Sequence, residues 1–446
     1  MTLHLRAMSA PLTSVTTADL DGRAVVMATM TPTEELTTLS AADALSLAEA
    51  VASARDQCLP FVGVLSLSGV EVGDGLDAAA AWGRVAHELV QASGTIPLFL
   101  VAHGPVVSGP SLLLALADVV VFTQEAYAFV SGPRMVEAYT GEPVTNTNLG
   151  GSGAHARSTG VASIVVDDID SALEAVSLVL GHLPDHVDAM PPHVPSDDPG
   201  DRPTPEAGEL LPSTPTGSYD VREVVEAIAD DGEFLELKPS WAPNIVTGFC
   251  FIGGHSVGIV ANQTQALAGS IDIPASQKGA RFVAMCDAFN IPLLTLVDTS
   301  GFLPGKDLEW RGMIRHGAQL AFAYARATVP RIGLILRKSY GGAYIVMDSR
   351  HMGNDVMLAW PSAEVAVMGA KGAVEILHRK ASPEERASLE REYEQRFLTP
   401  YVAAERSSIT AVIRPEETRS EIVATLDLLS TKRERLRPRR HDNTPL

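Results

Sequence analysis

The sequence has little of the chemistry that marks a metal site or a disulfide scaffold. It has only three cysteines in 446 residues, and they lie far apart with no CxxC pair. A disulfide framework and a zinc ribbon are therefore both excluded. The 12 histidines show neither HExxH nor HxH spacing, which argues against a metal centre. The chain also lacks the GxSxG segment of serine hydrolases and the GxxxxGK[ST] phosphate loop.

Positive charge is scarce as well. The chain has 34 basic residues against 54 acidic ones, a formal net charge of −20. Such a surface repels phosphate backbones and anionic lipids, so we expect neither a nucleic-acid nor a membrane partner. No apolar run approaches the roughly 18 residues that a membrane helix requires, and the first residues do not resemble a signal peptide. Because the cysteines also suit a reducing compartment, we expect a cytoplasmic location.

What the chain does have is enough apolar residues for two cores. Hydrophobic residues make up 46% of the sequence, and its length is typical of two domains. Residues 183–216 differ from the rest, because proline and acidic residues dominate and hydrophobic periodicity disappears. This composition is typical of an extended linker. We therefore expect an N-terminal domain at residues 1–182, a linker at 183–216 and a C-terminal domain at 217–446.

Each half alternates short apolar runs with helical segments. Runs such as Phe61–Leu67 and Leu293–Val297 are rich in apolar and β-branched residues, as strands covered on both faces are. The segment Ala280–Asn290 has apolar residues at helical spacing. Alternation of strands and helices indicates βαβ units and an α/β fold class.

The two halves repeat one plan. Pro97 and Pro330 lie 233 residues apart, and the same 233 residues separate Gly109 from Gly342. An offset this steady across several strand-like runs indicates an internal duplication. We therefore expect two α/β domains of similar design.

A glycine-rich turn follows a predicted strand in the second half, at residues 340–344. Ligands of α/β sheets bind at the carboxyl ends of strands, so this position is a candidate site. N–H groups at the start of a helix point outward toward negative charge, and glycine allows close approach. Without a phosphate-loop pattern, the turn suits a developing oxyanion on Gly342 and Ala343. A tight turn needed only for packing is the alternative.

The corresponding turn of the first half is altered. It contains Ser108 and Gly109, followed by Pro110 where the second half has Ala343. Proline has no N–H, so one possible donor is lost. An oxyanion donor is worth roughly 2.7–4 kcal/mol. This turn is therefore either a weakened site or one adapted to a different carbonyl.

No general base is evident in the sequence. Asp298, Asp307 and Glu309 flank the segment TSGFLPG, but their spacing forces no acid/base pair, and we expect solvated or capping carboxylates. A catalyst without an evident nucleophile, base or metal must rely on positioning and backbone electrostatics, or on a reactive group borrowed from a cofactor.

Several longer motifs resemble one known family. They include VGIVANQ, GFLPG, VPRIGLILRKSYGGAYIVM and AWPSAEVAVMGAKGAVEILHRK in the second half, and FVSGP, TGEPV and LGGSGAHARSTGVA in the first. On these residues the chain resembles the biotin-dependent acyl-CoA carboxyltransferases, the β subunits of acetyl-CoA and propionyl-CoA carboxylases. The resemblance is weak before Pro97, where SGVEVG replaces the SGGAR-like turn of the family. We therefore expect a divergent N-terminal domain.

The resemblance implies two duplicated crotonase-like (ClpP/crotonase) domains. It also implies a reaction in which CO2 moves from carboxybiotin to the α-carbon of a short acyl-CoA. Each domain would supply one backbone oxyanion hole, and an isoleucine after GGAY is typical of acetyl-CoA-type members. The implied residues are Gly342 and Ala343 in one hole, Ser108 and Gly109 in the other, Ile345 and Tyr344 beside the acyl group, and Gly341 and Tyr340 beside biotin.

The resemblance also implies partners. The chain has neither an MKM biotinylation site nor an ATP-grasp phosphate loop. Biotin would therefore be carried by a partner α subunit with biotin carboxylase and carrier domains, in a homo- or hetero-hexamer of β-type subunits. Two other functions stay open. One is a decarboxylase or transcarboxylase of a malonyl- or methylmalonyl-type thioester; the other is a non-catalytic companion subunit of a mixed hexamer.

Overall fold

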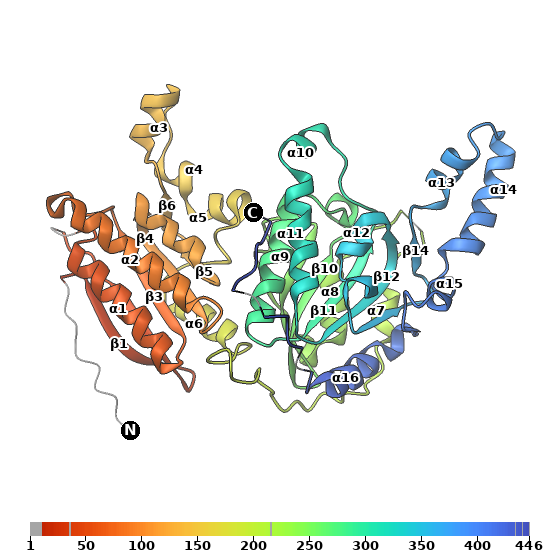
Figure 1. Ribbon diagram of the computed structural model, residues 1–446, viewed down its shortest axis with the longest axis horizontal. Coiled ribbons are helices and arrows are strands. Elements are labelled where there is room, and N and C mark those ends of the chain that lie inside the picture. Colours follow the sequence, from red (N-terminus) through yellow and green to blue (C-terminus); the bar gives the residue numbers. More distant parts are fainter. Residues whose placement is uncertain (1–10, 35–36, 215, 433, 439, 446) are drawn as a thin grey trace. The chain divides into compact units, whose positions relative to one another are not determined.

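The computed structural model describes residues 11–34, 37–214, 216–432, 434–438 and 440–445. The chain divides into two compact units between Pro191 and Pro192 (Figure 1). Each unit is built on one sheet. The strand order is β1-β2-β3-β4-β5-β7 in the first unit, with β6 pairing with β4. In the second it is β15-β13-β12-β11-β10-β9-β8, with β14 pairing with β12.

The first sheet starts as an antiparallel hairpin and continues in parallel. All seven residues of β3 are buried, as expected for a strand covered on both faces. Helix α1 packs on β2 and β3 and against α2. The strands are β1 Thr13–Leu20, β2 Arg23–Met30, β3 Phe61–Leu67, β4 Leu98–Val107, β5 Val119–Thr123, β6 Tyr127–Phe129 and β7 Ile164–Val166. The helices are α1 Ala41–Gln57, α2 Leu76–Ala92, the 3₁₀ helix η2 Gly109–Leu116, α3 Pro133–Thr140, α4 Asn146–Gly150, α5 Ser152–Ala154 and α6 Ile169–Leu180.

The second sheet repeats this plan. An antiparallel hairpin, β9–β10, leads into parallel β11, β12 and β13. Helix α9 packs against β9, β10 and α11, while α8 and α16 also contact β9 (Figure 1). The strands are β8 Leu235–Leu237, β9 Ile245–Ile252, β10 His255–Asn262, β11 Leu293–Thr299, β12 Arg331–Tyr340, β13 Val356–Ala359, β14 Glu364–Ala366 and β15 Ala411–Val412. The helices are α7 Pro205–Glu209, α8 Val221–Ile228, α9 Ile273–Ala288, α10 Lys306–Trp310, α11 Met313–Arg326, α12 Gly341–Val346, α13 Ala370–Leu377, α14 Pro383–Tyr393, α15 Pro400–Glu405 and α16 Thr418–Leu429.

The repeated plan confirms the predicted α/β class and the duplication. In both units a short extra strand, β6 or β14, pairs in parallel with the last residues of a long central strand, β4 or β12. A short helix then follows each long strand: α12 begins directly after β12, and η2 begins one residue after β4. The two candidate turns therefore occupy the same position in the two sheets. Among the described residues, no helix is both long and apolar enough to cross a bilayer.

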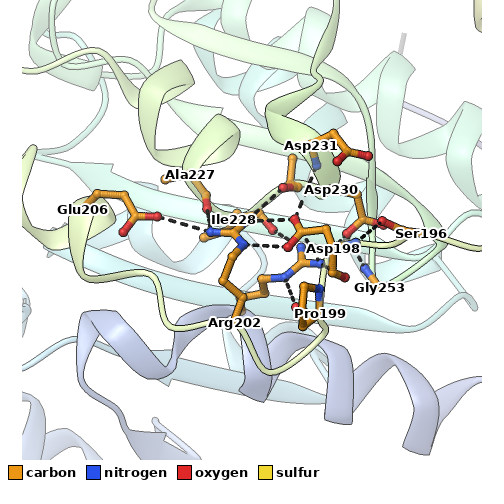
Figure 2. A network of polar contacts seen from close by, with 12 residues as sticks. Ser196, Asp198, Pro199, Arg202, Glu206, Ala227, Ile228, Asp230, Asp231 and Gly253 are labelled. Atoms are coloured by element: carbon orange, nitrogen blue, oxygen red, sulfur yellow. Dashed lines mark hydrogen bonds and ion pairs between the residues drawn. The ribbon is translucent and has the colours of Figure 1, made fainter.

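The predicted linker differs from an extended segment where it follows Pro192, because it folds onto the second unit. Arg419 of α16 is fully buried and donates to the carbonyl oxygens of Pro199 at 2.9 Å and Ile228 at 2.7 Å. Asp198 and Asp230 lie beside the same guanidinium group (Figure 2). The segment also contains α7, whose Ala207 is buried in the core of this unit, and composition does not reveal either contact. The domain boundaries themselves stay a prediction.

The carboxylates of this network are fully engaged. Asp230 accepts hydrogen bonds from the backbone N–H groups of Gly253 at 2.8 Å and Gly254 at 2.7 Å, in the β9–β10 turn. Arg202 holds both oxygens of Asp198, at 2.7 and 3.0 Å, and this contact keeps the pKa of Asp198 below its usual value. The network thus connects the start of the second unit, the β9–β10 hairpin and α16 (Figure 2).

Candidate active site

The second-unit turn lies where β12 ends and α12 begins. Tyr340 is extended, with φ −113° and ψ 137°, and Gly341 has φ +62°. That value is in the left-handed region, which favours glycine. A Cβ on Gly341 would also lie only 3.2 Å from the carbonyl oxygen of Val367. Glycine therefore allows the strand to become a helix within one residue.

This turn presents two backbone donors. Within the described chain, no residue accepts a hydrogen bond from the N–H of Gly342 or Ala343. The first N–H groups of a helix have no intrahelical partner, so they can bind an external oxygen. A Cβ built on Gly342 would make only ordinary contact with Phe302, at 3.6 Å. The predicted donors are thus neighbours on one turn.

Polar side chains around the turn are buried. Tyr340 donates its hydroxyl hydrogen to the carboxylate of Glu364 on β14. Burial, and then this hydrogen bond, raises the pKa of Tyr340. The hydroxyls of Ser339 and Tyr344 are buried and have no hydrogen-bond partner among the described residues. Buried hydroxyls normally have a hydrogen-bond partner, so these two are exceptions.

Asp298, near the end of β11, binds the last residues of β12 just before the turn. It accepts hydrogen bonds from Arg337 Nε and the Tyr219 hydroxyl, both at 3.0 Å, and from the backbone N–H of Lys338 at 3.1 Å. Burial raises its pKa, although Arg337 opposes the shift. The expectation of a solvated or capping carboxylate is wrong for Asp298, which is 1% exposed.

The cluster around Asp298 joins residues that are far apart in the chain. Tyr219 lies 79 residues before Asp298, and Arg337 lies 39 residues after it. No local spacing pattern could have indicated the cluster, because the parallel pairing of β11 and β12 brings Arg337 to Asp298, and hydrogen bonds with Thr264 hold Tyr219. Asp307 and Glu309 are exposed, in line with the prediction, and lie on α10.

The first-unit turn also has a residue with positive φ between its strand and its helix, but that residue is a serine. Ser108 follows β4 with φ +68° and ψ −155°, and η2 starts at Gly109. This region is almost exclusive to glycine, and a serine there costs on the order of 1–3 kcal/mol. Ser108 thus takes the position of Gly341 at an energetic cost.

The hydrogen bonds of this turn leave fewer backbone donors. The N–H of Ser108 donates to the carbonyl oxygen of Phe129 at 2.9 Å, which continues the pairing of β4 with β6. Pro110 has no N–H. Gly109 therefore supplies the one backbone N–H of residues 108–110 without an acceptor in the described chain. Ser108 can contribute to this site only through its side chain.

Gly109 and Gly342 differ in their surroundings, so their alanine variants are expected to differ in stability. A Cβ on Gly109 would lie 3.1 Å from the Trp82 ring, whereas on Gly342 it would be 3.6 Å from Phe302. Overpacking costs about 1–3 kcal/mol, while glycine inside a helix costs about 0.5–1 kcal/mol relative to alanine. We expect Gly109→Ala to lower the free energy of unfolding and Gly342→Ala to leave it unchanged or raise it. Urea denaturation of both variants measures this; equal losses would contradict the packing described here.

The chain is similar to known proteins over most of its length. The model of the carboxyl transferase domain matches residues 6–444. A propionyl-CoA carboxylase beta chain of Roseobacter denitrificans is 42% identical over 390 residues, which cover 87% of this chain and 76% of that protein. The methylmalonyl-CoA decarboxylase subunit alpha of Veillonella parvula is 39% identical, over 96% of this chain and 84% of that protein.

A solved structure is similar throughout. The transcarboxylase 12S structure, with methylmalonyl-coenzyme A and methylmalonic acid bound, has a TM-score of 0.95 and 38% identity, and it covers 98% of this chain and 85% of that one. This similarity confirms the duplicated crotonase-like fold. The expected divergence of the N-terminal domain is not borne out, since the family match starts at residue 6. The chain therefore belongs to the family of carboxyl transferase domain proteins.

Proposed function

We propose that this chain is the carboxyltransferase β subunit of a biotin-dependent acyl-CoA carboxylase. In this role it moves CO2 from carboxylated biotin to the α-carbon of a short acyl-CoA. The observation that supports it most is the turn with two unpaired N–H donors, Gly342 and Ala343, in a chain of this family. Relatives named as propionyl-CoA carboxylase beta chains support the same reaction class.

The chain's own contribution is electrostatic. The N–H groups of Gly342 and Ala343 bind the carbonyl oxygen that gains negative charge, and they are already oriented before the reaction. Biotin, when bound, supplies the activated carboxyl group and a ring nitrogen able to take the α-proton. Asp298 and Arg337 hold the ends of β11 and β12, which fixes the turn in place. No side-chain base from this chain is required.

The remaining residues of the turn are proposed to contact biotin and the acyl group. Tyr340 and Gly341 would lie beside the biotin ring. Ile345 is 36% exposed, so its apolar side chain is available to the acyl end of the substrate together with Tyr344. An isoleucine at this position favours a small acyl group such as acetyl.

We also propose association with other chains. Large apolar side chains are exposed on α3, around α10 and α11, and on α13, and surfaces of this kind mark protein interfaces. They include Met135, Tyr139, Trp310, Ile314 and Leu377. The transcarboxylase 12S structure is described as a hexamer assembly, which supports a hexamer of β-type subunits here. A separate α subunit would carry biotin, and a cytoplasmic location remains a prediction.

A second function is favoured by one relative. The Veillonella parvula protein is named as a methylmalonyl-CoA decarboxylase subunit, and it covers 96% of this chain. The donors of the two turns would stabilise the same developing oxyanions when CO2 leaves rather than when it arrives. The direction of the reaction therefore depends on the partner subunits and not on the residues of these turns.

One experiment tests turnover without any partner. The purified assembly is mixed with biocytin and either malonyl-CoA or methylmalonyl-CoA, and the decarboxylated acyl-CoA is followed by chromatography. We expect product formation that depends on biocytin and that is lost in Ala343→Pro. Absence of product with both thioesters would contradict a catalytic function and favour the companion-subunit alternative.

A further inference from the structure

We infer that the Ser108 hydroxyl donates a hydrogen bond to the substrate carbonyl bound at the first-unit turn, in place of the amide that Pro110 lacks. This inference rests on the proposed carboxyltransferase function. It assigns a side-chain donor to a site whose expected donors are all backbone N–H groups.

The conformation of Ser108 is the first observation. Its φ of +68° is close to the +62° of Gly341, which occupies the same place in the other sheet. With ψ at −155°, Ser108 lies in a region that is essentially restricted to glycine. Glycine would serve better if the turn needed only its backbone. Strained residues of this kind are concentrated at functional sites, so the side chain is the feature to explain.

The second observation is that both backbone groups of Ser108 are occupied. Its N–H donates to the carbonyl oxygen of Phe129 at 2.9 Å. Its own carbonyl oxygen accepts from the N–H of Ser111 at 3.1 Å and from the Ser111 hydroxyl at 2.7 Å. These bonds fix the peptide units on both sides of the residue. The hydroxyl is the one polar group of Ser108 that has no partner in the described chain.

The third observation concerns access to this hydroxyl. Ser108 is exposed. A Cβ built on Gly69, in the loop after β3, would lie 3.8 Å from the Ser108 Cβ, so the side chain stands beside that loop without contacting a polar group there. The Trp82 ring lies next to Gly109, 3.1 Å from a Cβ built there. The hydroxyl thus borders the turn and faces no competing acceptor among the described residues.

Counting donors gives the reason for the serine. The second-unit turn has two unpaired N–H groups, on Gly342 and Ala343, whereas the first-unit turn has one, on Gly109. A hydroxyl can donate to a carbonyl oxygen at about 2.5–3.0 Å, and it can rotate to do so. Ser108 therefore restores the count to two. No histidine or carboxylate of the described chain bonds to this hydroxyl, so it has no base and acts as a donor, not as a nucleophile.

Two variants and the wild-type assembly test this inference, with biocytin and malonyl-CoA or methylmalonyl-CoA as probes. Ser108→Gly removes the hydroxyl and relieves the backbone strain, so we expect a higher melting temperature and a loss of roughly 10²-fold in kcat/KM. A merely structural serine would not move these two readouts in opposite directions. In the double variant Ser108→Gly with Pro110→Ala, an amide donor returns, and we expect at least about a tenfold recovery over Ser108→Gly.

The outcomes separate this inference from the proposed function. If the wild-type assembly is active and Ser108→Gly has the same kcat/KM, the role of the hydroxyl is overturned. The carboxyltransferase function is then unaffected. A double variant no more active than Ser108→Gly would overturn the exchange of amide for hydroxyl. A wild-type assembly inactive with both thioesters would overturn the proposed function, and this inference with it.

Discussion

Replacing Ala343 by proline is expected to lower kcat for carboxyl transfer by about 10²–10³-fold, which is the usual effect of losing one oxyanion donor. The substitution removes one N–H and no hydrogen bond of the described chain, because Ala343 N–H has no acceptor there. Proline is tolerated in the first turn of a helix, and Pro110 already occupies the same position of the first-unit turn. Steady-state kinetics with biocytin and a malonyl-type thioester measures the effect.

The matched control for this variant is Ala343→Gly, which removes the methyl group but keeps the N–H. We expect it to lose far less activity than Ala343→Pro. Because Ala343 is fully buried, circular dichroism and a melting curve must accompany the kinetics. If a well-folded Ala343→Pro protein retained wild-type kcat, the second-unit turn would not be an oxyanion site.

Replacing Arg419 by alanine is expected to lower the free energy of unfolding by about 3–5 kcal/mol, as loss of one partner in a buried ion pair does. Arg419 is 0% exposed, and its Nη2 donates to Asp230 at 2.6 Å. Without it, Asp230 would keep a buried charge, and the carbonyl oxygens of Pro199 and Ile228 would each lose a donor. Urea denaturation monitored by tryptophan fluorescence measures the change.

An exposed arginine provides the control for this loss. The side chain of Arg414 is 65% exposed and pairs with Glu417 at 2.8 Å. Surface pairs of this kind contribute about 0–1 kcal/mol, so Arg414→Ala should have little effect. If Arg419→Ala lowered the free energy of unfolding no more than Arg414→Ala does, the network around residues 196–202 would not hold that segment in place.

Local pattern was enough to predict several of the parallel strands and the class of fold. The run Phe61–Leu67 coincides with β3, and Leu293–Val297 lies within β11. The helix expected at Ala280–Asn290 is α9, but it starts at Ile273, where the Asp272 side chain caps the N–H of Ala275. Apolar periodicity marked the middle of this helix, whereas its start depends on a cap and on proline at the first turn.

Long-range contacts explain what the sequence did not reveal. Residues 198–202 looked like a linker because they have no hydrophobic pattern, and a buried arginine more than two hundred residues later holds them. Asp298 looked like a solvated carboxylate because its partners lie on other elements. The GGA turn was recognisable because glycine is the expected residue at a positive φ, while Ser108 at +68° gave no such signal.

A crystal structure of the assembly with an acyl-CoA and biotin bound would show whether the second-unit turn binds an oxyanion. We expect a ligand carbonyl oxygen about 2.7–3.1 Å from the backbone nitrogens of Gly342 and Ala343. Binding of both ligands with every carbonyl oxygen remote from this turn would contradict it.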